Sequence, residues 1–165
     1  MARVVLVGMP GTGKSTLARL LATASEATWV DTDDLIELVR DATPAEILDS
    51  EGEDIFRAYE IAALRSALVS FDVVATGGGI VTTRVGREIL QGERVVWLTC
   101  PLDVLATRVE NSDRPLVRDA PAERLASLWA EREELYASVA TWELTTDGDV
   151  TNCLRQLMTM TGVGQ

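Results

Sequence analysis

The chain has 165 residues, of which 47% are hydrophobic and 25% are charged, so a single globular domain spanning residues 1–165 is expected rather than a disordered chain. Because it has no histidine and only two cysteines, imidazole-based metal sites, Ser-His or Cys-His catalysis and a disulfide framework are excluded. Its net charge of −11 argues against non-specific nucleic-acid binding, which depends on clustered basic charge.

The chain also lacks the signals of membrane insertion and secretion. No apolar run approaches the ~18 residues that a membrane span needs. The sequence Met1-Ala2-Arg3 leads directly into an apolar stretch without a signal-peptide cleavage pattern. We therefore expect a cytoplasmic protein with no membrane or nucleic-acid partner.

Short apolar runs alternate with helical patterns, which favours βαβ units and a parallel sheet. Strands are predicted at Arg3–Val7, Thr28–Asp31, Val73–Thr76, Arg94–Thr99 and Trp142–Thr145. Helices are predicted at Lys14–Ala24, Asp33–Val39, Pro44–Asp49, Glu53–Val69, Arg84–Leu90, Leu102–Val109, Pro121–Val139 and Val150–Met160. Ligands of such sheets bind beyond the carboxyl ends of the strands, so functional residues are expected just after each strand.

A glycine-rich motif follows the first predicted strand. Residues 8–15 read Gly8-Met9-Pro10-Gly11-Thr12-Gly13-Lys14-Ser15, which is G-x-x-x-x-G-K-[ST], the P-loop. Backbone N–H groups of such a loop and the following helix N-terminus bind phosphate oxygens. Lys14, the single lysine among 15 basic residues, can reach the β- and γ-phosphates, and Ser15 can bind Mg²⁺. The motif predicts a site for a nucleoside triphosphate and Mg²⁺; the alternative is a turn that only joins strand to helix.

Aspartates follow the second predicted strand. In P-loop enzymes an acidic residue at a strand end commonly helps to hold Mg²⁺, which makes Asp31 the best candidate for that role. Asp33, two residues later, could face a substrate hydroxyl and accept its proton. The alternative is that these aspartates cap the helix that starts near Asp34.

Three consecutive glycines, Gly77, Gly78 and Gly79, follow the third predicted strand. Glycines allow close backbone approach, so a ligand lying on exposed N–H groups would explain them. A tight turn from strand to helix would explain them equally well.

Two arginines occupy positions where an apolar residue is expected. Arg57 shares a helix face with Ile61, Leu64 and Leu68, and Arg132 lies within the apolar stripe of the Pro121–Val139 helix. An unpaired buried guanidinium is costly, so each should have an anionic partner. In a P-loop protein, that partner could be a carboxylate or phosphate of a second substrate, held bidentately. The alternatives are a structural ion pair, such as Arg57 with Glu60, or a snorkelling side chain.

A polar segment with two prolines and no periodicity runs from Asn111 to Pro121. A mobile lid over about residues 109–121, carrying Arg114 above the phosphates, would exclude water and stabilise the transferred charge. An ordinary surface loop is the alternative.

Taken together, these motifs resemble those of shikimate kinase, from Val4 to about Val139. The resemblance rests on the P-loop, Asp31-Thr32-Asp33-Asp34, Glu51-Gly52-Glu53, Phe56-Arg57 with Glu60, Gly77-Gly78-Gly79, Arg114-Pro115-Leu116, and Arg132 before Leu135-Tyr136. It implies a monomeric enzyme that transfers the γ-phosphoryl group of ATP to the 3-hydroxyl of shikimate, with Mg²⁺. The implied fold is a five-stranded parallel sheet of order 2-3-1-4-5, flanked by helices and closed by a mobile lid.

The resemblance also implies roles for individual residues. Asp33 would bind shikimate and act as the base, Arg57 and Arg132 would hold the carboxylate, and Gly78 and Gly79 would contribute backbone contacts. Lys14 would stabilise the transferring phosphate, and Arg114, from the lid, would bridge the γ-phosphate and the substrate. Ser15, with Asp31 in its shell, would bind Mg²⁺. The implied ATP-binding residues are Gly8, Met9, Pro10, Gly11, Thr12, Gly13, Lys14, Ser15, Thr16, Arg108 and Arg114.

Two other functions stay open at this point. A gluconate kinase would also bind a carboxylate bearing hydroxyls, although Phe56-Arg57 and the triple glycine favour shikimate. A nucleotide-binding regulatory module without turnover is the second alternative.

Overall fold

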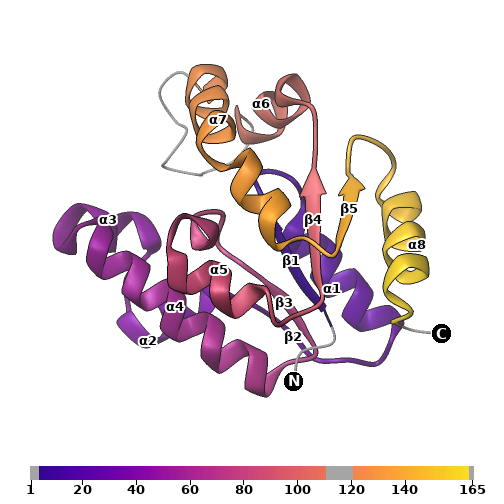
Figure 1. The fold of residues 1–165 in the computed structure, drawn as a ribbon, viewed down its shortest axis with the longest axis horizontal. Helices are drawn as coiled ribbons and strands as arrows, with labels where there is room; N and C mark the ends of the chain where they lie inside the picture. Colours follow the sequence, from indigo (N-terminus) through magenta and orange to yellow (C-terminus); the bar gives the residue numbers. More distant parts are fainter. Residues whose placement is uncertain (1–3, 111–120, 164–165) are drawn as a thin grey trace.

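The computed structural model describes residues 4–110 and 121–163 (Figure 1). Five parallel strands form one sheet in the order β2-β3-β1-β4-β5, which confirms the expected fold. The strands are β1 (Val4–Gly8), β2 (Trp29–Asp31), β3 (Val73–Ala75), β4 (Val95–Thr99) and β5 (Trp142–Thr145). The central strand β1 pairs with β3 through Val5 and Val74, and with β4 through Val5 and Val95.

All eight predicted helices are present. They are α1 (Lys14–Ala24), α2 (Thr32–Arg40), α3 (Pro44–Glu51), α4 (Glu53–Ser70), α5 (Arg84–Leu90), α6 (Leu102–Glu110), α7 (Pro121–Val139) and α8 (Val150–Thr161). A short 3₁₀ helix, η1 (Ile80–Thr82), was not predicted and follows the triple glycine. No helix among the described residues is long and apolar enough to cross a membrane.

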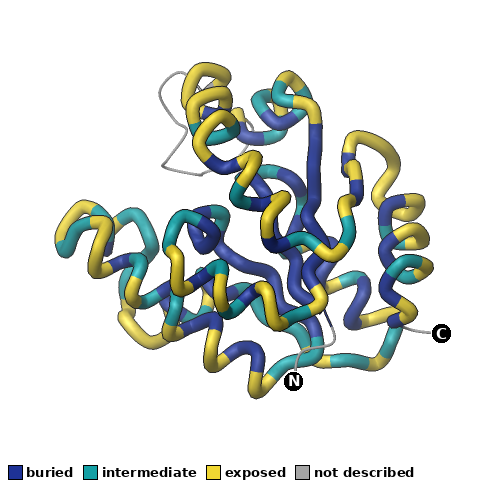
Figure 2. Tube along the Cα trace, viewed as in Figure 1, coloured by how far each residue is buried: buried dark blue, intermediate teal, exposed yellow. Residues whose placement is uncertain are grey.

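The two faces of the sheet build two separate cores, because successive side chains of a strand point to opposite faces. Val5 and Val7 of β1 pack with buried residues of α4, α5, α6 and α7. Val4 and Leu6 pack on the other face with buried residues of α1 and α8. Figure 2 shows the central strands buried along their length. Strands buried on both faces explain the continuous apolar run of β1.

The parallel arrangement brings all carboxyl ends of the strands to one edge of the sheet. The P-loop, Asp31, Gly77 and the residue after β5, Thr146, therefore lie at the same edge. A third apolar cluster, with Ile36, Ile47 and Phe56 at its centre, joins α2, α3 and α4 beside this edge.

The predicted lid coincides with the break between the two described ranges. Residues 111–120, and with them Arg114, lie outside the described residues. At the edges of the predicted lid, Val109 and Glu110 belong to α6, and Pro121 begins α7.

Candidate active site

The P-loop takes backbone conformations that favour glycine. Gly8, Gly11 and Gly13 have φ values of +149°, +86° and +91°, a region that side chains with a Cβ rarely adopt. A Cβ on Gly8 would also lie only 2.5 Å from the Leu98 carbonyl oxygen. Thr12 Oγ1 donates to the Met9 carbonyl at 2.8 Å and closes the loop across its tip.

The Lys14 ammonium lies within this loop at the N-terminus of α1. The side chain is buried, and Nζ donates to the carbonyls of Gly8 at 2.9 Å and Met9 at 3.0 Å. The lysine is therefore held at the carboxyl end of β1, where a phosphate on the loop would meet its charge.

Asp31 uses its two carboxylate oxygens for different purposes. Oδ1 accepts from the Asp33 backbone N–H at 2.9 Å and caps α2, while Oδ2 accepts from Ser15 Oγ. The capping alternative thus applies to Asp31, and it explains why α2 begins at Thr32, one residue earlier than predicted. Because only Oδ1 caps the helix, Oδ2 stays beside Ser15. Asp31 can therefore cap α2 and face the P-loop at the same time.

Ser15 and Asp31 fit the donor chemistry of a magnesium site, since Mg²⁺ prefers oxygen ligands and is usually held by few protein groups together with phosphates and water. Within residues 4–110 and 121–163, no group of three or more histidine, cysteine, aspartate or glutamate residues could hold a metal. The protein alone therefore offers a partial shell, which phosphate oxygens would have to complete.

Asp33 does not cap a helix. Its Oδ1 is buried and has no hydrogen-bond partner among the described residues. Burial, reinforced by the charges of Asp31 and Glu60 and opposed by Lys14, raises the pKa of Asp33 from 3.8 to about 7. A buried carboxyl with a free oxygen and a pKa near neutrality has the properties of a general base.

Arg57 forms the ion pair that was the structural alternative. Its Nη1 lies 2.6 Å from Glu60 Oε2, and its Nη2 lies 2.9 Å from Glu53 Oε1. The Glu60 side chain is 3% exposed, whereas that of Glu53 is 67% exposed. Burial raises the pKa of Glu60, and the Arg57 charge opposes that shift.

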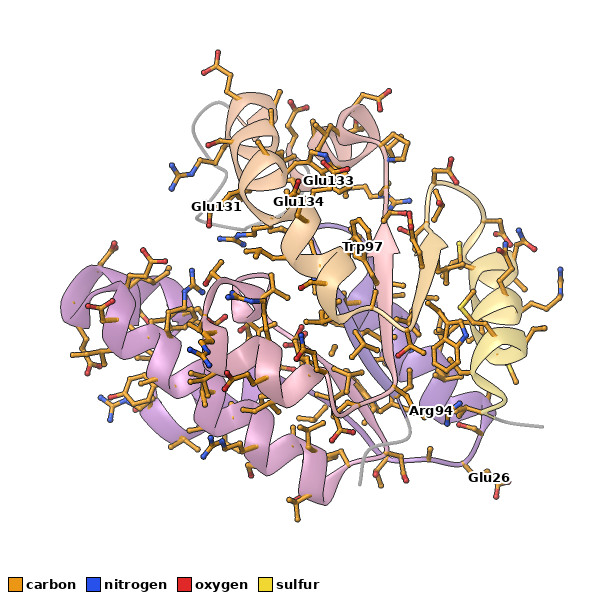
Figure 3. All side chains as sticks on the ribbon, viewed as in Figure 1. Glu26, Arg94, Trp97, Glu131, Glu133 and Glu134 are labelled. Atoms are coloured by element: carbon orange, nitrogen blue, oxygen red, sulfur yellow. The ribbon has the colours of Figure 1, made fainter. Side chains whose placement is uncertain are left out.

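The guanidinium of Arg132 is buried, and its charge acts on the buried carboxylate of Glu60. Its Nε has no hydrogen-bond partner in the described chain and lies 3.6 Å from Oε1 of the mostly exposed Glu131 (Figure 3). A buried guanidinium nitrogen without a partner is costly, so the expectation of an anionic ligand stands beside the ion pair with Glu131.

The triple glycine brings Asp33, Arg57 and Arg132 together. A Cβ on Gly77 would lie 2.7 Å from both Asp33 Oδ1 and Glu60 Oε1, and one on Gly79 would collide with the Arg57 guanidinium. A Cβ on Gly78 would lie 3.5 Å from Arg132 Nη1. None of the three glycines has a positive φ, so close approach is what requires glycine at positions 77 and 79.

Side chains from three elements fix this glycine loop, residues 77–79. Thr32 Oγ1 accepts from the Gly77 N–H at 3.0 Å, Tyr136 Oη donates to the Gly78 carbonyl at 2.6 Å, and Thr82 Oγ1 donates to the Gly79 carbonyl at 2.7 Å. The sequence assigned no role to these three hydroxyls. For Tyr136 a signal existed, because it lies four residues after Arg132 and so on the same helix face.

A cleft of about 330 Å³ opens beside the P-loop, on the side away from the glycine loop. Gly11, Thr12, Gly13, Thr16, Leu17, Arg108, Thr146, Gly148, Val150 and Cys153 line it. Arg108 donates to the carbonyls of Gly11 at 3.3 Å and Thr146 at 2.5 Å, so it joins the P-loop to the segment after β5. Sequence reasoning found Arg108 but not the α8 residues Val150 and Cys153, whose side chains carry no phosphate- or base-binding signal.

Known proteins share both this sequence and this fold. The family model "Shikimate kinase" matches residues 10–161. A shikimate kinase of Corynebacterium glutamicum is 42% identical over 146 residues, which are 87% of this chain and 86% of that protein. One of Streptomyces avermitilis is 40% identical over 148 residues, 88% of this chain and 86% of that protein.

Solved structures show the same relationship. The shikimate kinase of Acinetobacter baumannii, in complex with shikimate, superposes with a TM-score of 0.89 at 32% identity and covers 96% of this chain and 92% of its own. A gluconokinase of Sinorhizobium meliloti superposes with a TM-score of 0.69 at 22% identity, over 98% of this chain and 91% of its own, which shows a shared fold alone. The family match, the identity to full-length relatives and the assembled site agree: this chain belongs to the shikimate kinase family.

Proposed function

We propose that the protein transfers the γ-phosphoryl group of ATP to the 3-hydroxyl of shikimate, giving 3-phosphoshikimate and ADP. The observation that carries this proposal is the convergence of Asp33, Arg57 and Arg132 on the glycine loop, next to the Lys14 ammonium. The position of one carboxyl and two guanidinium groups beside a P-loop suits a second substrate that is both an anion and an alcohol. The complex of the 32% identical Acinetobacter enzyme with shikimate supports the choice of substrate.

The acceptor substrate would lie between α4 and α7. Arg57 and Arg132 bind its carboxylate, since a guanidinium can hold a carboxylate through two hydrogen bonds. The backbone of Gly78 and Gly79 contacts the acceptor substrate. Asp33 accepts the proton of the attacking hydroxyl, since its free, buried oxygen has a pKa near neutrality.

ATP would lie along the P-loop, with its base in the cleft beside Arg108 and Thr146. Backbone N–H groups of residues 11–16 bind the phosphates, and Lys14 stabilises the charge that develops on the transferred group. We assign Arg114 to the same charge from the segment after α6, as part of a lid that excludes water.

Ser15 and Asp31 are the residues that would hold Mg²⁺. A bound magnesium ion supplies charge neutralisation on the phosphate oxygens. The hydrogen bond between Ser15 and Asp31 keeps both oxygens in place before any ligand arrives. We further propose a monomeric, cytoplasmic enzyme that works on small molecules, and the acidic composition agrees with the lack of a nucleic-acid partner.

The test is ADP release from Mg-ATP with shikimate and, in parallel, with gluconate. Shikimate is expected to raise the rate well above the rate of ATP hydrolysis alone, and gluconate is not. Equal stimulation by both acids would refute the assignment of substrate. A rate that neither acid changes would leave a P-loop protein without this kinase activity.

A further inference from the structure

Tyr136 lies in the interior with its hydroxyl directed at the backbone of the glycine loop. The residue is 0% exposed, and its ring stacks on Trp97 of β4 at a centroid distance of 5.9 Å. A phenylalanine would fill the same space and make the same ring contact. Core packing therefore does not require the hydroxyl, which donates a hydrogen bond of 2.6 Å to the Gly78 carbonyl.

That hydrogen bond fixes more than one atom, because a peptide unit is planar. In a trans peptide the carbonyl of Gly78 and the N–H of Gly79 lie in one plane and point in opposite directions. A donor that holds the Gly78 oxygen on the α7 side therefore turns the Gly79 N–H away from Tyr136. Gly79 also lies against the Arg57 guanidinium, so the peptide that this hydrogen bond orients is next to a residue assigned to the acceptor substrate.

The same hydroxyl connects the glycine loop to Arg132. The two residues lie one helical turn apart on α7, and the Arg132 guanidinium interacts with the Tyr136 hydroxyl. Burial disfavours the charged phenolate more than the Arg132 guanidinium favours it, and this raises the pKa of Tyr136 to about 12. The phenol therefore keeps its proton at neutral pH. A neutral phenol can accept from a guanidinium and donate to a carbonyl at the same time.

We propose that Tyr136 is a positioning residue for the acceptor substrate. Its hydroxyl orients the Gly78–Gly79 peptide and keeps that peptide in a fixed position relative to Arg132. This inference rests on the proposed function and deepens it. Glycine has the greatest backbone freedom of any residue, so a loop of three glycines needs such external holds to keep one conformation. Thr32 and Thr82 hold its two ends, and Tyr136 holds the middle peptide.

The test compares Tyr136→Phe with a matched loss of a hydroxyl elsewhere. Thr161→Val is the control, because Thr161 is 3% exposed and its Oγ1 donates to the Leu157 carbonyl at 2.7 Å in α8, on the other face of the sheet. Tyr136→Phe is expected to raise the KM for shikimate about tenfold and to leave the KM for ATP within about twofold. Thr161→Val is expected to change neither constant.

A spectrum of the unsubstituted protein gives a second readout, which does not depend on how the variant folds. With ¹⁵N-glycine labelling, the 12 glycines give a simple set of amide signals. Added shikimate is expected to shift the Gly79 signal and leave that of Gly92, after α5, in place. An unmoved Gly79 signal at saturating shikimate would overturn the inference.

The kinetic outcomes separate the inference from the function on which it rests. If the wild type phosphorylates shikimate and Tyr136→Phe leaves its KM unchanged, or raises the KM for ATP equally, the hydroxyl has only a structural role and the inference is wrong. If the wild type does not act on shikimate at all, the proposed function is wrong and this role falls with it.

Discussion

Glu60 accepts a hydrogen bond from Arg57 Nη1 at 2.6 Å while lying almost completely buried beneath the glycine loop. A second carboxylate, Glu53, holds the other side of the same guanidinium but is mostly exposed. Arg57 is thus fixed from two sides in environments of very different polarity. Removal of one partner from a buried pair leaves the other charge uncompensated, whereas an exposed pair contributes little, so the two glutamates should not matter equally.

Exchange of each glutamate tests this difference. Glu60→Gln is expected to raise the KM for shikimate about tenfold, because Arg57 loses its buried charge partner and its fixed position. Glu53→Gln is the matched control and is expected to change that KM by less than about twofold. Steady-state kinetics at saturating ATP measure both. Equal effects of the two substitutions would show that Glu60 does not position Arg57.

Arg132 should tolerate lysine poorly. A lysine keeps the positive charge but loses the planar fork that can hold a carboxylate through two hydrogen bonds. Arg132→Lys is therefore expected to weaken shikimate binding by roughly tenfold to a hundredfold, with ATP binding unchanged. Arg124→Lys, at an exposed position of the same helix, is the control. Calorimetric titration with shikimate measures the effect, and full affinity in Arg132→Lys would rule out the bidentate contact.

The glycine loop should not accept even one methyl group at residue 79. The added Cβ would occupy the place of the Arg57 guanidinium, which must then move away from Glu60. Gly79→Ala is expected to lower kcat/KM for shikimate by about a hundredfold or more, since a misplaced binding group affects orientation as well as affinity. Gly92→Ala, whose Cβ would make an ordinary contact of 3.6 Å with the Ile89 carbonyl, is expected to behave as wild type. A fully active Gly79→Ala enzyme would contradict the observed proximity.

Asp33 should make folding stability depend on pH in an unusual direction. Its pKa is raised from 3.8 to about 7 in the folded protein, so between these values the unfolded chain ionises while the folded protein keeps its proton. Ionisation then favours the unfolded chain, so the contribution of Asp33 to the free energy of unfolding falls as pH rises from about 4 to 7.

The asparagine in Asp33→Asn cannot ionise. The substitution therefore removes the loss of folding stability that the raised pKa of Asp33 causes as pH rises. The free energy of unfolding of Asp33→Asn, minus that of the wild type, is expected to grow between pH 4 and pH 7 and then to level off. Denaturant titrations in the presence of EDTA measure it without bound metal. Asp49→Asn, on an exposed face of α3, is the control and should show no such trend. A constant difference across this range would show that Asp33 has an ordinary pKa.

The local parts of the site are predictable from the sequence. The P-loop is a contiguous motif whose conformation and chemistry are set by its own glycines, lysine and serine. Asp31 and Asp33 follow from the rule that ligands meet the ends of parallel strands. The inward position of Arg57 and Arg132 follows from helical periodicity.

The contacts between these parts are not predictable in the same way. The capping alternative and the magnesium role both involve Asp31, and only the folded chain shows that its two oxygens divide between Asp33 and Ser15. Thr32 reaches Gly77 over 45 positions, and Tyr136 reaches Gly78 over 58. Periodicity reports that Tyr136 is buried, because its ring is large and apolar. It does not report which carbonyl its hydroxyl meets, since that depends on tertiary packing.

The proposed activity is phosphorylation of shikimate at one hydroxyl, with Asp33 as the base. The most direct measurement is ³¹P and ¹H NMR of the product formed from Mg-ATP and shikimate by the wild type and by Asp33→Asn. We expect one new phosphate monoester, coupled to the proton at carbon 3 of shikimate, and a rate of its formation that falls at least about a hundredfold in Asp33→Asn. No ester, an ester at another hydroxyl, or an equally fast Asp33→Asn enzyme would contradict the account.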